Sequence, residues 1–214
     1  MDQLLTRQLL DTTRGRIVAL LRASGLTADD LALKLGLSGS AVRIQLAGME
    51  RDGVVRRAGT RRGTTRPSLV FELTDEVEQL LSKAYLPVVT QLVQVFAEQL
   101  TPAPLEALLR EAGRRLAGEL LRGVRPTGAL PSRVAAASQM LNDQLGALTH
   151  VESNGKYVIR GAGCPLAALT GKHPGVCLAM ESLVSHVVGV SARECCDRSA
   201  RPRCCFEIRK RGRS

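Results

Sequence analysis

The stretch TADDLALKLGLSGSAVRIQLAGMERD, residues 27–52, decides the fold of the N-terminal part of the chain. Thr27 and Ser38 each stand where a helix can begin, because a hydroxyl there can accept a hydrogen bond from a free N–H of the first helical turn. Gly36, between them, favours a tight turn. Three apolar residues of the second helix share one face: Val42, Leu46 and Met49. Two helices joined by three or four residues that include a glycine are typical of a helix-turn-helix.

A helix is expected over residues 11–22 before this motif, and the residues after it predict a wing. Residues 54–55 and 69–73 are β-like runs, and the segment between them is rich in Arg, Gly and Thr. Residues 51–66 contain six arginines against one acid, Asp52. An arginine-rich hairpin directly after a helix-turn-helix indicates a winged helix that binds DNA.

The geometry of B-DNA indicates which of these residues would contact it. The major groove admits one α-helix, and a helix N-terminus can also contact phosphate. The wing would follow the backbone or enter the minor groove. The candidate contacts on the second helix are Ser38, Ser40, Arg43 and Gln45. The candidate contacts on the wing are Arg61, Arg62, Thr64, Thr65 and Arg66.

Composition limits the partners. The formal net charge of +10 favours a polyanion but does not separate nucleic acid from a membrane surface. Aromatic residues make up 2% of the chain, so stacking on unpaired bases lacks its main tool, and double-stranded DNA is the expected target. The N-terminus is polar, and no apolar run approaches the roughly 20 residues of a membrane span. We therefore expect a cytoplasmic protein with no membrane partner.

The middle of the chain is expected to be helical. Five apolar residues recur at steps typical of a short coiled-coil seam: Leu86, Val89, Val93, Phe96 and Leu100. The seam predicts a homodimer, although one amphipathic helix packed on its own subunit would show the same pattern. Thr101-Pro102 predicts the start of another helix. Residues 123–131 are the expected loop or hinge, and a helix follows over residues 132–145.

The last third of the chain mixes strands and helices. Asn154-Gly155 between residues 148–152 and 156–160 predicts a β-hairpin with a type I′ turn. A helix over residues 174–186 and strands over 191–196 and 203–208 should follow. The fold class is therefore α+β. Three parts are expected: a winged helix-turn-helix at 1–74, central dimerisation helices at 75–125, and a small α+β cysteine-rich domain at 126–214.

All six cysteines lie in the last 51 residues. In a cytoplasmic chain such a group indicates metal or redox chemistry before structural disulfides. Cys164 and Cys177 are separated by twelve residues, and Cys195-Cys196 and Cys204-Cys205 fall on the two terminal strands. Neighbouring residues of a strand face opposite sides, so only one member of each doublet can easily point into a single site. Two of the six cysteines should therefore be spare.

Four thiolates from separated elements can hold a [2Fe–2S] or [4Fe–4S] cluster, or a tetrahedral zinc ion. The wide gap after Cys164 suits a cluster, and the lack of a short C-x₂₋₄-C knuckle lowers the case for zinc without excluding it. A thiol–disulfide switch is a further alternative. His173, inside the gap, is expected to be a polar surface group rather than a ligand.

The sequence resembles the SufR family, iron–sulfur-sensing repressors with a winged helix of the DeoR/ArsR kind. The resemblance spans nearly the whole chain, and the cysteine spacing is its specific part. Three N-terminal segments carry it: residues 40–46, residues 50–55, and residues 66–67 with 71–74. Its C-terminal part rests on Cys164-Pro165 with twelve residues to Cys177, on residues 183–190 and on residues 203–208.

Membership would imply a homodimer that represses genes of cluster assembly or stress response, with cluster occupancy controlling its operator affinity. The usual half-site geometry of dimers predicts a two-fold operator. The resemblance carries over Cys164, Cys177, Cys204 and Cys196 as ligands, although the doubled cysteines leave the third and fourth ambiguous. No phosphate loop, nucleophile elbow or carboxylate–histidine constellation is recognisable, so we expect no enzyme and no small-molecule substrate. The alternatives are a thiol- or zinc-dependent regulator, and an enzyme or cluster carrier that docks through its winged helix.

Overall fold

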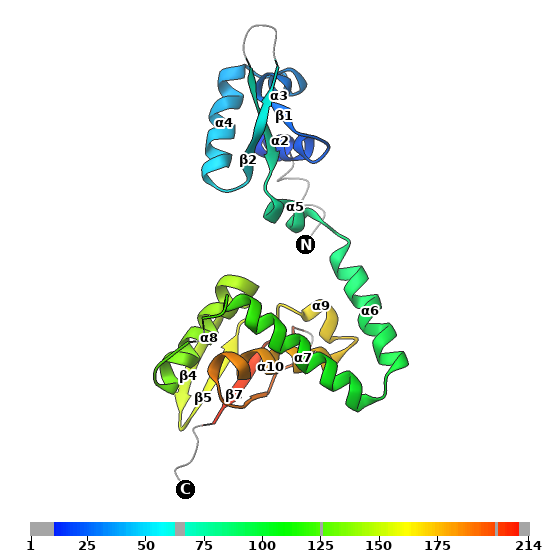
Figure 1. Cartoon of the computed structure of the whole chain (residues 1–214), viewed down its shortest axis with the longest axis vertical. Helices are drawn as coiled ribbons and strands as arrows, with labels where there is room; N and C mark the ends of the chain where they lie inside the picture. Colours follow the sequence, from blue (N-terminus) through cyan, green and yellow to red (C-terminus); the bar gives the residue numbers. More distant parts are fainter. Residues whose placement is uncertain (1–10, 63–66, 125, 200, 210–214) are drawn as a thin grey trace. The chain divides into compact units, whose positions relative to one another are not determined.

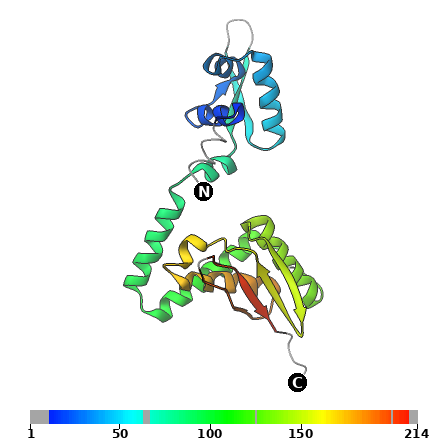
Figure 2. The ribbon, with the colours of Figure 1, turned by 180° about the vertical axis from the view of Figure 1, so that it is seen from behind.

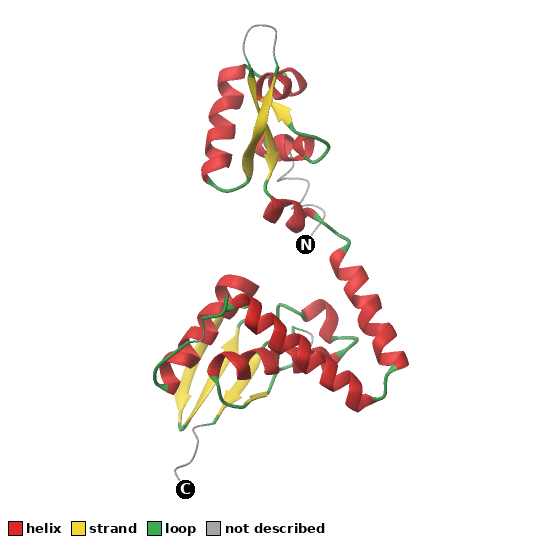
Figure 3. Cartoon of the chain, in the orientation of Figure 1, coloured by secondary structure: helices red, strands yellow, loops and turns green. Residues whose placement is uncertain are grey.

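The computed structural model describes residues 11–62, 67–124, 126–199 and 201–209. The chain forms two compact units, Met1–Lys83 and Ala84–Ser214, which Figures 1 and 2 show from opposite sides. The boundary between the units falls inside the helical part expected at 75–125. The helical part from Ala84 onward belongs to the C-terminal unit, and its second long helix packs in the core of that unit. Both units combine helices with an antiparallel sheet (Figure 3), which confirms the α+β class.

The N-terminal unit is a helical layer against a three-stranded sheet of order β1-β3-β2. Its elements are α2 (Thr13–Leu21), β1 (Leu26–Thr27), α3 (Ala28–Leu35), α4 (Gly39–Arg51), β2 (Val55–Arg61), β3 (Ser68–Leu73) and α5 (Asp75–Leu81). Strand β2 runs further into the arginine-rich segment than the sequence predicted, because residues 59–61 pair with residues 68–70 of β3.

Local signals explain the helix-turn-helix. The Thr27 hydroxyl accepts a hydrogen bond from the N–H of Asp30, whose carboxylate accepts one from the N–H of Thr27. Gly36 ends α3 with a φ of +67°, a left-handed conformation that glycine adopts without steric cost. Ser38 then caps α4 by accepting from the N–H of Ala41 at 3.2 Å. The predicted caps and turn are confirmed.

The C-terminal unit is built on a four-stranded antiparallel sheet of order β4-β5-β7-β6. Its helices are α6 (Tyr85–Gln99), α7 (Pro102–Leu120), α8 (Leu130–Leu145), α9 (Ala167–Thr170), the 3₁₀ turn η1 (Pro174–Val176) and α10 (Cys177–Val188). Its strands are β4 (Thr149–Asn154), β5 (Lys156–Gly161), β6 (Ala192–Glu194) and β7 (Cys205–Ile208). The β4–β5 hairpin lies where it was predicted.

The turn of that hairpin differs from the prediction. A type I′ turn needs a positive φ at both central residues. Gly155 has a φ of +69°, whereas the φ of Asn154 is not positive. The register pairs Asn154 directly with Lys156, which makes the connection tighter than a two-residue loop. The type I′ assignment is therefore wrong, although the hairpin is present.

The core of the C-terminal unit lies between the sheet and helices α8 and α10, as Figure 1 shows. Ile159 of β5 pairs with Phe206 of β7, and both side chains are buried there. Helix α7 packs closely on α10 at Gly113, where a Cβ atom would lie 2.0 Å from the carbonyl oxygen of Ala179. Any residue larger than glycine at position 113 would force the two helices apart.

Helix α6 exposes most of its apolar side chains. Of the predicted seam, Val93 packs beside a small cluster centred on Leu109, whereas Leu86, Val89 and Phe96 are exposed in the single chain. In the part of the chain that the structure describes, no single helix is both long and apolar enough to cross a membrane. The bent pair α5 and α6 meets those length and composition limits only when the two helices are taken together.

Candidate DNA interface and cysteine site

Helix α4 presents one face to the core and the opposite face to solvent. Its buried side chains are Val42, Leu46 and Met49. The side chains on the opposite face are exposed: Ser40, Arg43, Ile44, Ala47 and Arg51. The predicted contacts Ser40 and Arg43 lie on this face, and Gln45 lies half-buried at its edge. Ser38 caps the helix and also shares a hydrogen bond of 3.1 Å with the Ser40 hydroxyl.

Acidic residues of α3 hold two of the predicted contact arginines. Arg43 Nη1 lies 3.2 Å from Asp29 Oδ1, and Arg61 Nη1 lies 2.9 Å from Asp30 Oδ2. Arg61 also donates to the carbonyl oxygen of Gly25 at 3.0 Å. Exposed ion pairs of this kind contribute only about 0–1 kcal/mol, so a DNA phosphate can compete for either guanidinium.

The Asp30 carboxylate belongs to both the helix cap and the wing. The Thr27 backbone N–H lowers the pKa of Asp30 most, followed by the Thr27 hydroxyl, and Arg61 adds to the shift. Arg62 makes no ion pair with the described residues. The remaining wing predictions, Thr64, Thr65 and Arg66, lie outside the described residues.

Ile44 is a surface residue of α4 that the sequence reasoning missed. Its side chain is 71% exposed beside Arg43, on the face opposite the buried stripe. An apolar side chain at such a position can contact a thymine methyl group in the major groove. The signal was available in the sequence, because Ile44 lies two residues from both Val42 and Leu46 and so falls off their face.

Three of the four predicted cysteine ligands meet in the C-terminal unit. Cys177 is the first residue of α10, Cys196 lies two residues after β6, and Cys204 immediately precedes β7. The sulfurs of Cys177 and Cys196 lie within 4.8 Å of each other. The sulfur of Cys196 also accepts from the N–H of Cys205 at 3.2 Å. Cys204 is not part of that close group, but Cys196 packs against the core cluster to which Cys204 belongs.

Neighbouring groups raise the pKa of two of these thiols, Cys177 and Cys196. The hydrogen bond with Cys196, together with burial, raises the pKa of Cys177 far above the ordinary value of a thiol, although Arg198 opposes the shift. For Cys196, the hydrogen bond with Cys177 lowers the pKa. The bond with Cys204 and burial outweigh that effect and raise the pKa to about 12. A metal that binds here must displace protons.

The backbone beside Cys164 contacts the backbone of Cys204. The N–H of Cys204 donates to the carbonyl oxygen of Gly163 at 3.2 Å, and the Cys164 side chain packs against the same core cluster as those of Cys196 and Cys204. Cys164 is not one of the donors that lie together with Cys177, Glu194 and Cys196.

The remaining two cysteines form a disulfide on the other face of the same strands. Cys195 and Cys205 are bonded, with their Cα atoms 4.9 Å apart. The bond lies in a groove with charged residues of the outer sheet face: Glu152, Lys156, Arg160 and Glu207. Each doublet thus places one cysteine on the inner side and one on the outer side, as the alternation of a strand predicts. The sequence had favoured metal or redox chemistry over such a bond.

Glu194 is the site residue that the sequence reasoning missed. One of its carboxylate oxygens lies within 4.8 Å of the sulfurs of both Cys177 and Cys196. Oε2 pairs with Arg198 at 2.5 Å, and Oε1 accepts from the N–H of Cys196 at 2.8 Å. No motif in the sequence singled it out, because its closeness to Cys177 depends on how β6 lies against α10.

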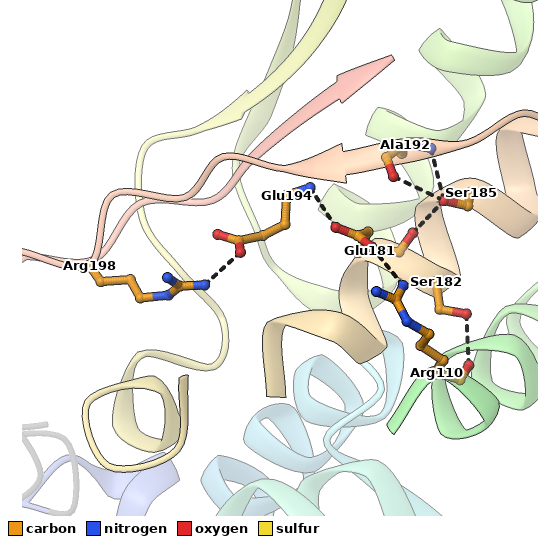
Figure 4. A network of polar contacts seen from close by, with 7 residues as sticks. All are labelled: Arg110, Glu181, Ser182, Ser185, Ala192, Glu194 and Arg198. Carbon is orange, nitrogen blue, oxygen red and sulfur yellow. Dashed lines mark hydrogen bonds and ion pairs between the residues drawn. The ribbon is translucent and has the colours of Figure 1, made fainter. Parts of the chain in front are cut away.

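A polar network connects this site to two helices, as Figure 4 shows. The N–H of Glu194 donates to Glu181 Oε2 of α10 at 2.8 Å, and Arg110 Nη1 of α7 donates to Glu181 Oε1 at 2.6 Å. The Ser182 hydroxyl also donates to the carbonyl oxygen of Arg110 at 2.7 Å. The start of the terminal hairpin is therefore tied to α10 and α7 by directional contacts.

His173 differs from its expected surface position. The residue is half-buried before η1, and its Nε2 atom is buried without a hydrogen-bond partner among the described residues. It is not one of the donors that lie together with Cys177, Glu194 and Cys196.

Comparisons with known proteins identify the N-terminal unit. A family model described as "Winged helix-turn-helix DNA-binding" matches residues 10–56. Residues 10–56 thus carry a winged helix-turn-helix DNA-binding domain. No curated protein matches the sequence.

Among solved structures, this chain is similar to reduced HlyU from Vibrio cholerae. The two are 28% identical over 36% of this chain and 76% of that one, with a TM-score of 0.28. Bacillus subtilis PadR in complex with operator DNA is 17% identical over 83% and 93%, with a TM-score of 0.30. The MepR A103V mutant from S. aureus is 22% identical over 55% and 84%, with a TM-score of 0.31.

The matched segment of the chain includes α4 and the predicted contacts Ser38, Ser40, Arg43 and Gln45. It ends at residue 56, so the cysteine-bearing part of the chain lies beyond it. The chemistry of the cysteines must therefore be argued from their own geometry.

Proposed function

We propose that this chain is a transcriptional regulator that binds a two-fold operator as a homodimer, and that an iron–sulfur cluster on Cys164, Cys177, Cys196 and Cys204 controls its operator affinity. The observation that carries the proposal is that the sulfurs of Cys177 and Cys196 lie within 4.8 Å of each other, while Cys164 and Cys196 pack against the core cluster that contains Cys204. Cysteine thiolates are the usual ligands of iron–sulfur clusters, so the donor set fits the group.

The ligands come from two separate parts of the C-terminal unit. Cys164 and Cys177 bound the segment that holds α9 and η1, whereas Cys196 and Cys204 flank the turn between β6 and β7. Ligation by all four residues would join this segment to the terminal hairpin. A cluster would supply a centre that oxidants or iron shortage can remove, and its loss would release that junction.

The polar network offers a route from the ligands to the dimer helices. Cys177 begins α10, and α10 contacts α7 through Gly113 and through the ion pair of Glu181 with Arg110. Helix α7 directly follows α6, whose exposed apolar side chains would form the homodimer seam. A coupling of about 1–3 kcal/mol between ligation and helix position would suffice to switch operator affinity.

The test is anaerobic purification followed by absorption spectroscopy and assays of iron and acid-labile sulfide. We expect a coloured protein that loses both elements in Cys177→Ser and Cys204→Ser. The double variant Cys195→Ser/Cys205→Ser, which removes only the outer disulfide, should retain them. A colourless wild-type protein without iron would refute the cluster.

The same preparations test the control of DNA binding. Sequences selected from a random duplex library by the anaerobic protein serve as operators in gel shifts before and after exposure to air. We expect the affinity to change by roughly 5- to 150-fold, the range of typical allosteric couplings. An affinity that is independent of cluster content would separate the cluster from regulation.

One observation favours a second candidate, a regulator controlled by thiol–disulfide exchange. Cys195 is exposed while bonded to the buried Cys205, so a dithiol reductant can reach one sulfur of the pair. In this case Cys195→Ser/Cys205→Ser would abolish the response of DNA binding to oxidants, and the wild-type protein would contain no iron.

A further inference from the structure

An oxygen donor lies beside the thiols of Cys177 and Cys196. Cys177, Glu194 and Cys196 each offer one ligand atom, and these atoms lie within 4.8 Å of one another. Cys204 is outside that group but is the nearest further sulfur candidate, because Cys196 packs against the core cluster to which Cys204 belongs and its sulfur accepts from the N–H of the next residue, Cys205. In a tetrahedral zinc site with Zn–S bonds of about 2.3 Å, the sulfurs lie roughly 3.8 Å apart. For Cys177, Glu194 and Cys196 the upper limit of 4.8 Å on the present separations is about 1 Å above that value. Cys204 would have to move closer to complete the site.

Polar contacts hold the carboxylate of Glu194 in place, as neighbouring groups commonly do for a metal ligand. Its side chain is 14% exposed, and its two oxygens contact Arg198 and the N–H of Cys196. The backbone of Glu194 is fixed in turn by Glu181. Hydrogen bonds of this kind commonly orient first-sphere ligands, and both oxygens retain lone pairs for a metal.

The local charge also suits a divalent ion. Three thiolates and one carboxylate around M²⁺ leave a net charge of −2, which the Arg198 guanidinium partly offsets. Arg198 contacts both Glu194 and the Cys177 thiol, so it lies beside two of the four donors. Sulfur donors with one carboxylate favour zinc or cadmium over magnesium or calcium, which take oxygen ligands.

We propose that Cys177, Cys196, Cys204 and Glu194 form a mononuclear site for Zn²⁺ or Cd²⁺, and that Cys164 is not part of it. The inference deepens the proposed function, because it assigns the same three thiols a second binding mode that competes with the cluster. As each metal–sulfur bond forms, the thiol gives its proton to solvent, so one ion releases three protons. The two modes differ in their fourth ligand.

The experiment uses Co²⁺ as a spectroscopic probe in the metal-free full chain, under anaerobic conditions, with Zn²⁺ and Cd²⁺ as competitors. We expect thiolate-to-cobalt charge-transfer bands and the strong visible bands of tetrahedral cobalt in the wild type and in Cys164→Ser. Both sets of bands should disappear in Cys177→Ser. Glu194→Gln should weaken binding by at least the roughly 10–100-fold typical of losing a supporting partner of a metal site.

Two further variants make the result specific. Glu152→Gln alters another glutamate of this unit, one whose carboxylate pairs with Arg160 on the outer sheet face, and it should leave cobalt affinity unchanged. Glu194→Asp keeps a carboxylate and should retain part of the affinity, which distinguishes loss of a ligand from loss of folding. Repeating the titration in Cys195→Ser/Cys205→Ser removes any contribution from thiols of the opened disulfide.

The outcomes separate this inference from the proposed function. Tetrahedral cobalt that depends on Glu194 in a protein that never holds iron would support the site and refute the cluster. A protein that holds iron and sulfide but binds cobalt equally well with Glu194→Gln would refute the site alone. Loss of cobalt binding in Cys164→Ser, with no effect of Glu194→Gln, would show a four-cysteine site and overturn the inference.

Discussion

The two units of the protein carry their candidate sites in opposite ways. In the N-terminal unit, Arg43, Ile44 and Arg61 are exposed and lie outside a core that is complete without them. In the C-terminal unit, Cys204 is itself a core residue, and Cys164 and Cys196 pack against the same cluster. Substitutions at the exposed site should therefore leave the fold intact, whereas substitutions at the buried thiol site should also lower the stability of the core around it.

The largest expected effect comes from the core that supports the thiols. Phe206, 1% exposed on β7, follows Cys204 by two residues. Phe206→Ala should lower the free energy of unfolding by about 3–5 kcal/mol, because it removes a large side chain from a closed core. Denaturant unfolding of the full chain, which should resolve two transitions, measures this. Ile44→Ala, the matched exposed change, should stay within about 0.5 kcal/mol. Equal losses would remove the contrast between the units.

Arg43→Ala should change DNA binding without changing stability. We expect the preference of the protein for its selected sequence to fall by about 1–3 kcal/mol, the typical contribution of a base-reading arginine. Gel shifts against selected and scrambled duplexes measure this preference, and unfolding curves serve as the control. A uniform loss on both duplexes would instead assign Arg43 to the DNA backbone.

The two wing arginines should contribute to DNA affinity by amounts that differ by less than the effect expected for Arg43→Ala. Arg62→Ala and Arg61→Ala should both weaken binding to all sequences and reduce the slope of the salt dependence by about 1. The loss of affinity should be larger for Arg62, since Arg61 must first leave Asp30 whereas Arg62 has no ion pair to break among the described residues. Binding titrations across salt concentrations test the order, and a larger effect of Arg61→Ala would contradict it.

The helix cap should have a moderate effect confined to the N-terminal unit. Thr27→Ala removes the hydroxyl that accepts from the N–H of Asp30 and should cost about 1 kcal/mol. Only the unfolding transition of that unit should shift, and the metal content of the C-terminal unit should be unchanged. A change in cobalt or iron binding would show that the two units are coupled.

The smallest effect is expected from acid. The pKa of Asp30 is lowered in the folded protein by Thr27 and Arg61, so its ionised form stabilises the fold at neutral pH. This contribution is complete above the ordinary aspartate pKa of about 4, and it is lost as the pH falls through the lower pKa of the folded state. Thermal unfolding of Asp30→Asn should therefore show a shallower decline below about pH 4 than the wild type. Equal slopes would contradict the assignment.

Much of the winged helix could be predicted because its signals are local. The caps at Thr27 and Ser38 and the turn at Gly36 depend on contacts within about four residues, which the sequence displays directly. The alternation of side chains along a strand likewise predicted that each cysteine doublet would divide between two faces. The same reasoning missed Ile44, although the period of the helix was sufficient to find it.

The sequence by itself determined the α+β class, the winged helix-turn-helix and the grouping of the cysteines. Only the tertiary structure decided that Cys195 bonds Cys205, that Glu194 lies beside Cys177, and that Arg110 holds Glu181 across 71 residues of chain. The physical reason is that these contacts depend on strand register and on how α7 and α10 pack. Both are set by the burial of the whole core rather than by neighbouring residues.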